Sequence, residues 1–325
     1  MKKKLNSLRL SALCLSALLA LSGCGATAAG ETTSQAGSAA VSSSAATQAT
    51  AATPEQTGET RTVSTVMGDV EVPTDPQRVI ITYGTGDLVA MGVRPVAVFG
   101  VEGTAYEDEV ADIPELTAFE PEAIMVHDPD LIIAVNEEQY EIGAQIAPTV
   151  LLPFTELSMQ ERMTFLGEVL NKQEEAKACY DNFAAKVDSA KAELSTMNIM
   201  DKTISLFEAS GKGTVWVYGD KWGRGGDLVY SQLGFAAPEI VQNEIIAKDQ
   251  YRELSMEVLN EYAGDYILFS GELGDLAENP VWNAIPAVAQ GHVIPIDFDL
   301  FYNIDIYSSA VQLDYLMEQF RQISA

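Results

Sequence analysis

One long helical segment in the middle of the chain separates two regions that share a different pattern. Residues 173–197 contain no Pro or Gly, and their apolar side chains recur at helical spacing. Such a helix would be about 35 Å long, at about 1.5 Å per residue. On both sides, short apolar runs alternate with amphipathic segments, a pattern typical of parallel sheets flanked by helices. The sequence therefore predicts two similar α/β lobes with mostly parallel sheets, joined by a single long helix.

The apolar runs give the expected strands of each lobe. The N-terminal lobe is expected over 61–172, opening with a hairpin at 61–73 and continuing with strands at 79–83, 95–99, 130–135 and 149–152. Helices are expected between them, at 86–91, 121–126 and 138–146. Gly167 and Asn171 mark a break before the long helix. The C-terminal lobe is expected over 198–325, with strands at 203–207, 214–218, 266–270 and 293–296 and a closing helix at 308–323.

Two internal echoes support a pair of similar lobes. Residues 79–89 (VIITYGTGDLV) and 215–229 (VWVYG, then GDLV) both read as a strand, a Tyr-Gly turn and a helix that opens on Gly-Asp-Leu-Val. A second echo places a Glu eight residues before an Asp that opens an apolar run, at Glu122 and again at Glu257. Two such lobes enclose a cleft, which the carboxyl ends of their parallel strands face.

The first 23 residues are expected to be a lipoprotein signal peptide. A basic start, MKKK, precedes an apolar run over 10–21 that is shorter than the roughly 20 residues a bilayer requires. The run ends in Leu-Ser-Gly and then Cys24, which resembles the bacterial signal whose thiol is acylated after cleavage. Residues 24–60, rich in Ala, Ser, Thr and Gln, are expected to form a disordered tether. We therefore expect a lipid-anchored protein on the outer face of a cell membrane. The tether suits a single-membrane Gram-positive cell, and a periplasmic setting is the alternative.

Composition excludes several function classes. Removing the signal takes away four basic residues and leaves 15 basic against 47 acidic ones, a formal net charge of −32, which argues against nucleic-acid binding. Cys179 would be the only thiol besides the lipidated one, so no disulfide or Cys-based metal site is expected. His127 and His292 stand in no metal-ligand spacing. No nucleophile–base set or phosphate loop occurs, so we expect neither catalytic residues nor a metal site, and a protein that is not an enzyme.

A Gly-rich turn carries the clearest binding signal. Residues 218–226 read YGDKWGRGG, which places Trp222 and Arg224 two residues apart between an expected strand and helix. Arg offers five donors in a rigid plane and no acceptor, and Trp offers a large rigid face. Together they suit a ligand that presents oxygen acceptors beside apolar spacers. A surface turn with a solvated Arg and a half-buried Trp would carry the same pattern.

At this turn the chain resembles a known family, the substrate-binding lipoproteins of ABC importers for iron(III) siderophores whose two lobes are joined by one long helix. The matching stretches, in the family's order, are VEVPTDPQRVIITYGTGDLVAMGVRPVAVFG (70–100), PDLII (129–133), IAPTV (146–150), LVYSQLGFAAPE (228–239), LSMEVLNEYAGDYIL (254–268) and NPVWNAIPAVAQGHVIPID (279–297). The resemblance extends over essentially the whole chain from about residue 62. It implies capture of a ferric siderophore, whose own oxygens hold the iron, with no covalent cofactor.

Within that family, YGDKWGRGGDLVY is similar to the ferric hydroxamate binders, which implies ligand contacts for Trp222 and Arg224. A ferric tris-hydroxamate core is neutral and rich in oxygen, whereas a ferric tris-catecholate is strongly anionic and would favour several basic residues, of which this chain has few. The expected ligand is therefore a hydroxamate or a mixed hydroxamate–carboxylate siderophore. Further ligand-binding candidates, for each of which core packing is the alternative, are Tyr83, Tyr106, Tyr140, Tyr218, Trp282 and Tyr302.

The resemblance also implies partners and leaves alternatives open. Glu122 and Glu257 are similar, one in each lobe, to the carboxylates that dock on arginines of the permease subunits. The protein is expected to be a monomer that binds its siderophore and delivers it to an ABC permease. The same fold binding haem, cobalamin or a ferric catecholate remains an alternative, since Tyr could serve as an axial ligand of haem. A lipid-anchored surface hydrolase, or an adhesin without a cleft, would be a protein of another class.

Overall fold

The computed structural model describes residues 58–211 and 213–324, so the expected signal peptide, Cys24 and nearly all of the expected tether lie outside the described residues. The described chain begins with a hairpin of two antiparallel strands, β1 (Thr60–Thr65) and β2 (Gly68–Pro73), as expected from the sequence. Thr60, the last residue assigned to the tether, already belongs to β1. None of the helices in this part of the chain is both long and apolar enough to cross a membrane.

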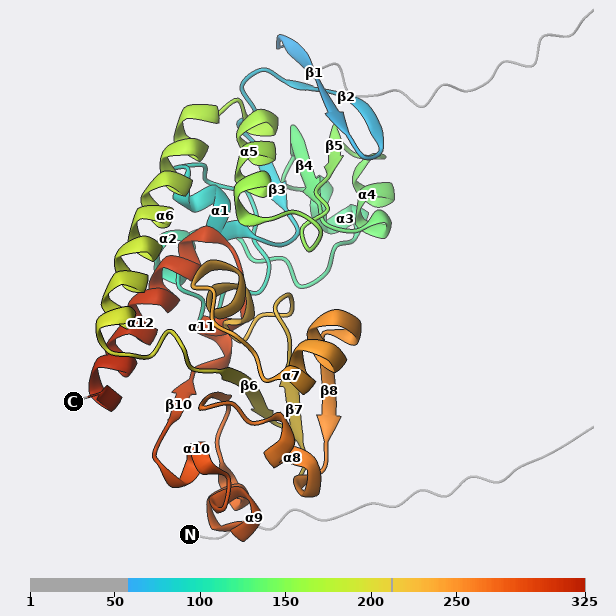
Figure 1. Cartoon of the computed structure of the whole chain (residues 1–325). Coiled ribbons are helices and arrows are strands. Elements are labelled where there is room, and N and C mark those ends of the chain that lie inside the picture. The colour runs from blue at the N-terminus through green and yellow to red at the C-terminus, as the bar shows by residue number, and fades with distance from the viewer. Residues whose placement is uncertain (1–57, 212, 325) are drawn as a thin grey trace, which may run out of the picture. The chain divides into compact units, whose positions relative to one another are not determined.

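The first α/β lobe is built on a short parallel sheet. Strands β3 (Val79–Ile81), β4 (Leu131–Ala134) and β5 (Thr149–Leu151) pair in that order, and every residue in them is buried. The helices between them are α1 (Thr85–Ala90), α2 (Glu107–Val110), α3 (Pro121–Met125) and α4 (Glu137–Gly143) (Figure 1). The strand expected at 95–99 is wrong, because Ala97 and Val98 make only isolated bridges to two different neighbours, and Pro95 has no N–H to donate.

Two helices follow β5, and their boundary has a local cause. Helix α5 (Met159–Leu170) begins with a capping box, in which Ser158 and Glu161 satisfy each other's backbone N–H. It ends at Asn171, whose φ of 56° is left-handed, so the break lies there. Gly167 lies inside α5, where a Cβ would come within 2.8 Å of the Ala176 side chain. The prediction of a break is therefore confirmed at Asn171 and wrong at Gly167, which is instead a point of close contact between α5 and α6.

The long helix matches the expectation closely. Helix α6 (Gln173–Thr196) ends one residue before the predicted boundary. It lies beside the final helix α12 (Ile306–Ser324), as Figure 1 shows, and two ion pairs join them. Lys186 contacts Asp314 at 2.6 Å, and Arg321 contacts Glu193 at 2.6 Å.

The second lobe is built on a mixed sheet of five strands. Their spatial order is β10 (Val293–Ile296), β9 (Tyr266–Ser270), β6 (Ile204–Ala209), β7 (Val215–Tyr218) and β8 (Tyr251–Leu254). The first three are parallel, and β7 and β8 are antiparallel to their neighbours. The sequence did not predict β8, because it is an edge strand in which only Leu254 is buried. The remaining elements are η1 (Asp227–Gln232), α7 (Glu239–Val241), η2 (Gln242–Asp249), α8 (Met256–Tyr262), η3 (Gly274–Glu278), α9 (Pro280–Asn283), α10 (Pro286–Ala289) and α11 (Phe298–Tyr302).

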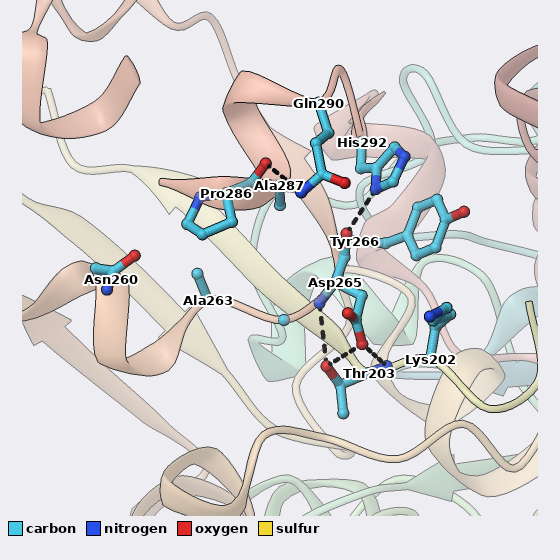
Figure 2. Close-up of a pocket in the computed structure, with 11 residues that line it drawn as sticks. Lys202, Thr203, Asn260, Ala263, Asp265, Tyr266, Pro286, Ala287, Gln290 and His292 are labelled. Atoms are coloured by element: carbon cyan, nitrogen blue, oxygen red, sulfur yellow. Dashed lines mark hydrogen bonds between the residues drawn. The ribbon is translucent and has the colours of Figure 1, made fainter. Parts of the chain in front are cut away.

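The two sequence echoes differ in structural meaning. Asp130 opens β4, and its carboxylate accepts the backbone N–H groups of Gln77 and Arg78, just before β3. Asp265 opens β9 and accepts the N–H and hydroxyl of Thr203, just before β6 (Figure 2). These aspartates therefore occupy equivalent places in the two sheets. The Tyr-Gly echo has no such equivalence, because β3 pairs in parallel with β4 whereas β7 is antiparallel to both of its neighbours.

A buried ionic junction ties the two lobes together. The Arg162 Nε atom of α5 lies 2.7 Å from Oδ2 of Asp87 in α1, and both side chains are almost fully shielded from water. Arg162 also donates through Nη2 to the Ile304 carbonyl at 2.9 Å. Asp87 in turn accepts the Ile306 N–H at 2.7 Å, at the start of α12. Three segments distant in the sequence therefore share one network of hydrogen bonds.

A second carboxylate lies in the same junction. Asp305 is fully buried and accepts the backbone N–H and the hydroxyl of Ser308, which orients the first turn of α12. Burial, and then the nearby charge of Asp87, raise the pKa of Asp305. Gly86 is packed against this carboxylate so closely that a Cβ would come within 1.9 Å of Oδ1. The residue at position 86 must therefore be glycine for this junction to close.

Replacing Arg162 with Met tests how much the lobes depend on the junction. The substitution should lower the free energy of unfolding by about 3–5 kcal/mol, because it leaves Asp87 as a buried charge without its partner. The matched control is Arg321→Met, which breaks an exposed Arg–Glu pair and should cost less than about 1 kcal/mol. Urea denaturation followed by circular dichroism measures both. Equal losses in the two variants would contradict a special role for the buried pair.

Candidate functional site

The turn that follows β7 has an unusual backbone. Three consecutive residues, Gly223, Arg224 and Gly225, have positive φ angles of 73°, 56° and 79°. Gly223 is required there, because a Cβ would come within 2.5 Å of the Tyr302 carbonyl oxygen. The Arg224 N–H donates to the Phe301 carbonyl at 2.7 Å. The turn is therefore held against α11, which places its side chains beside those of that helix.

Arg224 itself is in a conformation that its residue type disfavours. A non-glycine residue in the left-handed region is destabilised by about 1–2 kcal/mol. Such strain persists where the surroundings impose it, and it is concentrated at binding and catalytic sites. Here the two flanking glycines and the contact with α11 impose it. The strain makes Arg224 a candidate for a functional residue independently of its chemistry.

The Arg224 guanidinium is bound by one carboxylate. Its Nε donates to Oε2 of Glu208 at 2.6 Å, and its Nη2 donates to Oε1 at 3.2 Å. Its Nη1 donates to the Trp222 carbonyl at 3.1 Å. The side chains of Arg224 and Glu208 are 11% and 16% exposed, so this bidentate pair lies just beneath the surface. The Tyr218 hydroxyl donates to the same Glu208 at 3.1 Å.

Aromatic rings surround this guanidinium. Its central carbon lies 4.4 Å from the centroid of Tyr218, 4.7 Å from Phe298 and 5.8 Å from Tyr302. Trp222 and Tyr251 extend the group, with ring centroids 4.9 Å apart. Large parts of four rings remain open to solvent, including 53% of Trp222. We call the following set the Arg224 patch: Glu208, Tyr218, Trp222, Arg224, Tyr251, Phe298 and Tyr302.

The first lobe reaches this patch through Tyr83. Tyr83 follows β3, its ring lies 6.3 Å from that of Tyr302, and its hydroxyl donates to the Tyr302 carbonyl at 3.4 Å. On its other side, Tyr83 contacts Phe154 at 4.7 Å, and Phe154 lies 4.3 Å beneath the guanidinium of Arg162. Burial and neighbouring charges raise the pKa of Tyr83, so it remains a neutral donor. A continuous line of contacts therefore runs from the buried junction to the Arg224 patch.

A polar cavity of about 320 Å³ lies along the same line. Its lining includes Phe154 and Arg162 from the first lobe, and Asp220, Lys221 and Asp227 from the turn and the start of η1. Burial raises the pKa of Asp227. Residues of both lobes therefore line one hollow next to the patch.

The structure brings together only some of the residues proposed from the sequence. Tyr83, Tyr218, Trp222, Arg224 and Tyr302 lie together, as described above.

The other aromatic candidates lie elsewhere. Tyr106 is 2% exposed and packs against Tyr307, and Trp282 is 1% exposed between Phe207 and Phe269. Both are therefore packing residues, because no ring face is left for a ligand. Tyr140 is half-buried on α4 and makes none of the ring contacts that join the patch in the described chain. Trp216 is half-buried beside Tyr251 at the edge of the patch.

Three residues of the patch were missed from the sequence. Glu208 is a charged residue near the carboxyl end of an otherwise apolar strand, ISLFEA, and that position alone could have singled it out. Tyr251 belongs to the edge strand that the pattern did not reveal. Phe298 opens α11, a five-residue helix with no periodicity to detect. Only tertiary contacts bring these residues to the turn.

The two docking candidates occupy matching places. Glu122 lies in the first turn of α3 and Glu257 in the first turn of α8, and both are exposed. Each helix leads into the strand that its echo aspartate opens, β4 in one lobe and β9 in the other. A hydrogen bond from the Ser255 hydroxyl lowers the pKa of Glu257, so this residue stays charged.

A second cavity, also of about 320 Å³, lies at the amino ends of the parallel strands of the second sheet. Lys202, Asp265 and His292, which precede β6, β9 and β10, line it together with Gln290 (Figure 2). Its polar groups largely satisfy one another: Asp265 binds Thr203, and Nδ1 of His292 lies 3.0 Å from the Asp265 carbonyl. Since the carboxyl ends of the strands face away from it, we place no ligand there. Within residues 58–211 and 213–324, no three His, Cys, Asp or Glu side chains gather to hold a metal ion.

Comparisons with known proteins give consistent matches. The family model described as periplasmic binding protein matches residues 82–300. The chain is 30% identical to the iron(3+)-hydroxamate-binding protein YxeB of Bacillus subtilis, over 80% of this chain and 85% of that protein. It is 29% identical to the iron(3+)-hydroxamate-binding protein FhuD of the same organism, over 80% and 86%. Among solved structures, a FhuD-fold periplasmic binding protein of a Fep/Fec-like ferrichrome ABC transporter from Bacillus subtilis matches with a TM-score of 0.70 and 27% identity, over 79% and 99%.

Proposed function

This chain belongs to the periplasmic binding protein family, and we propose that it captures a ferric hydroxamate, or mixed hydroxamate–carboxylate, siderophore and delivers it to an ABC permease for iron uptake. Relatives at 30% and 29% identity carry the name iron(3+)-hydroxamate-binding protein, which supports this class of ligand. The protein would perform no chemistry, because the iron remains bound to the siderophore's oxygens throughout.

The observation that carries this proposal is the frame of aromatic rings around Arg224. The guanidinium supplies donors to ligand oxygens, and the exposed faces of Trp222, Phe298 and Tyr302 supply apolar walls. A ferric tris-hydroxamate presents both kinds of surface, since its hydroxamate oxygens surround the metal and alkyl spacers connect them. Ligand binding also accounts for a cluster of exposed aromatic rings on an otherwise acidic molecule.

Ligand titration tests the proposal. We expect a ferric trihydroxamate to quench the tryptophan fluorescence of the chain from residue 24 onward, because the ligand would cover Trp222. Ferric tris-catecholate, haem and cobalamin are titrated in parallel. Quenching by none of the four would exclude siderophore transport, and tight binding of haem or cobalamin alone would support the alternative cargo.

Substitutions within the Arg224 patch locate the binding surface. Trp222→Ala and Arg224→Ala should each weaken binding of the trihydroxamate by about 1–3 kcal/mol, because each removes a contact of a buried ligand. Arg321→Ala is the control, since it also breaks a bidentate Arg–Glu pair, on α6 and α12. Isothermal titration calorimetry gives the affinities. Unchanged binding in both patch variants would assign the turn a structural role only.

For delivery, we propose that Glu122 and Glu257 dock on basic residues of the permease. Both residues are exposed at matching places in the two lobes, which supports this role. One contact on each lobe would let the transporter sense the relative orientation of the lobes. The double substitution Glu122→Ala and Glu257→Ala should leave siderophore affinity unchanged and reduce uptake of labelled iron by cells. A matched control replaces Glu174 and Glu318, which are exposed on α6 and α12. Uptake as fast as in the control would exclude this docking role.

We further propose that Cys24 carries the lipid that holds the protein on the outer face of a cell membrane, as a monomer. The argument rests on the sequence of the leader, and a tethered binder stays close to its permease. In Cys24→Ser the thioether to lipid has no sulfur from which to form, so the protein should leave the membrane fraction. Fractionation and metabolic labelling with palmitate measure this change. Membrane retention of the variant would contradict lipid attachment at this position.

A further inference from the structure

We propose that Glu208 sets the charge selectivity of the binding site, so that, of the two ligand classes proposed above, the site favours neutral and cationic hydroxamate complexes and disfavours anionic ones, mixed hydroxamate–carboxylate complexes included. This inference rests on the proposed function and adds to it a residue that decides between classes of ligand. It starts from the pairing of Arg224, because an arginine in a binding site is ordinarily expected to attract anions. Here the carboxylate of Glu208 already forms an ion pair with the guanidinium of Arg224.

The pairing leaves no net charge for a ligand. Both oxygens of Glu208 contact Arg224, at 2.6 and 3.2 Å, in the bidentate geometry that gives the strongest such pairs. The Tyr218 hydroxyl donates to the same carboxylate and holds it in place. Glu208 also lies in β6, between two paired strands, so its backbone is fixed by the sheet. A ligand carboxylate or catecholate would have to displace an intramolecular partner that is already positioned.

The pairing nevertheless keeps Arg224 useful as a donor. Of the five guanidinium N–H groups, two are used on Glu208 and one on the Trp222 carbonyl. Two remain that bond to no described residue, and the side chain keeps 11% of its surface exposed, so we assign these two to ligand oxygens. A neutral hydroxamate oxygen needs a donor and not a full counter-charge, so the paired guanidinium still suits it.

The surroundings add negative charge. Helix α11, which contributes Phe298 and Tyr302, is capped by Asp297 and also carries Asp299. Lys221 brings a positive charge in the turn, and it lines the polar cavity beside two acidic residues, Asp220 and Asp227. The full chain has a formal net charge of −28. A complex with several negative charges would therefore be repelled, whereas a trihydroxamate with a pendant ammonium group would be attracted.

The variant Glu208→Gln tests this inference, with Glu193→Gln as its control. Each substitution removes one negative charge from a bidentate Arg–Glu pair, but Glu193 lies on α6 and pairs with Arg321 on α12. Affinities are measured by fluorescence quenching for a neutral ferric trihydroxamate, a trihydroxamate with a pendant ammonium group, and a ferric tris-catecholate. Glu208→Gln should raise the affinity for the tris-catecholate, relative to the neutral complex, by about tenfold, since one unit of local repulsion against three ligand charges disappears. The ammonium-bearing complex should lose about twofold.

The outcomes separate this inference from the proposed function. If the wild-type chain binds none of the three complexes, the proposed function fails. If it binds the neutral trihydroxamate but Glu208→Gln changes the ratios no more than Glu193→Gln does, only the role of Glu208 fails. Should Glu208→Gln not fold, salt dependence of the wild-type chain decides. Between about 20 and about 300 mM salt, tris-catecholate binding should strengthen as repulsion is screened, and weakening would overturn the inference.

Discussion

The buried pair of Arg162 and Asp87 is the interaction on which the rest of the structure depends. Removing two charges from water is costly, and the mutual attraction compensates only when further hydrogen bonds satisfy both groups. Here the Ile304 carbonyl and the Ile306 N–H supply them, so the pair is satisfied only when the segment before α12 is in place. The pair also fixes Phe154, and through it Tyr83 and Tyr302. The same network that joins the lobes therefore supports one wall of the candidate site.

Two arginines in this molecule show how burial changes the use of one side chain. In the interior, Arg162 donates through Nε to Asp87 and through Nη2 to the Ile304 carbonyl. Its guanidinium also lies over the Phe154 ring. Arg224 has a similar pairing with Glu208 and a similar contact with rings, but it lies beneath an exposed aromatic surface. The first arrangement orders the fold. The second keeps a donor available without a free charge, which suits a ligand that is rich in oxygen and close to neutral.

Much of the fold could be predicted from the sequence, because local patterns of apolar residues indicate its main helices and strands. The long helix was found within one residue of its end, since 173–197 lacks any breaker, and the buried strands around Ile80 and Ile132 were found from their apolar runs. The edge strand β8 and the false strand at 95–99 depend on pairing partners, which periodicity does not encode. Trp222 and Arg224 could be chosen because their turn is a local feature. The pairing of Glu208 with Arg224 and the burial of Trp282 depend on tertiary contacts, so the sequence did not predict them.

The backbone of the turn has a consequence for how such a site changes over evolutionary time. Gly223 and Gly226 admit no side chain, because a Cβ would meet backbone oxygens at 2.5 and 2.1 Å. Arg224 is joined to two elements at once, so single replacements there disturb more than one contact. Trp222 and Phe298, in contrast, are exposed and can vary without disturbing the fold. New cargo preferences should therefore arise by exchange of the outer rings, around a guanidinium and a turn that change little.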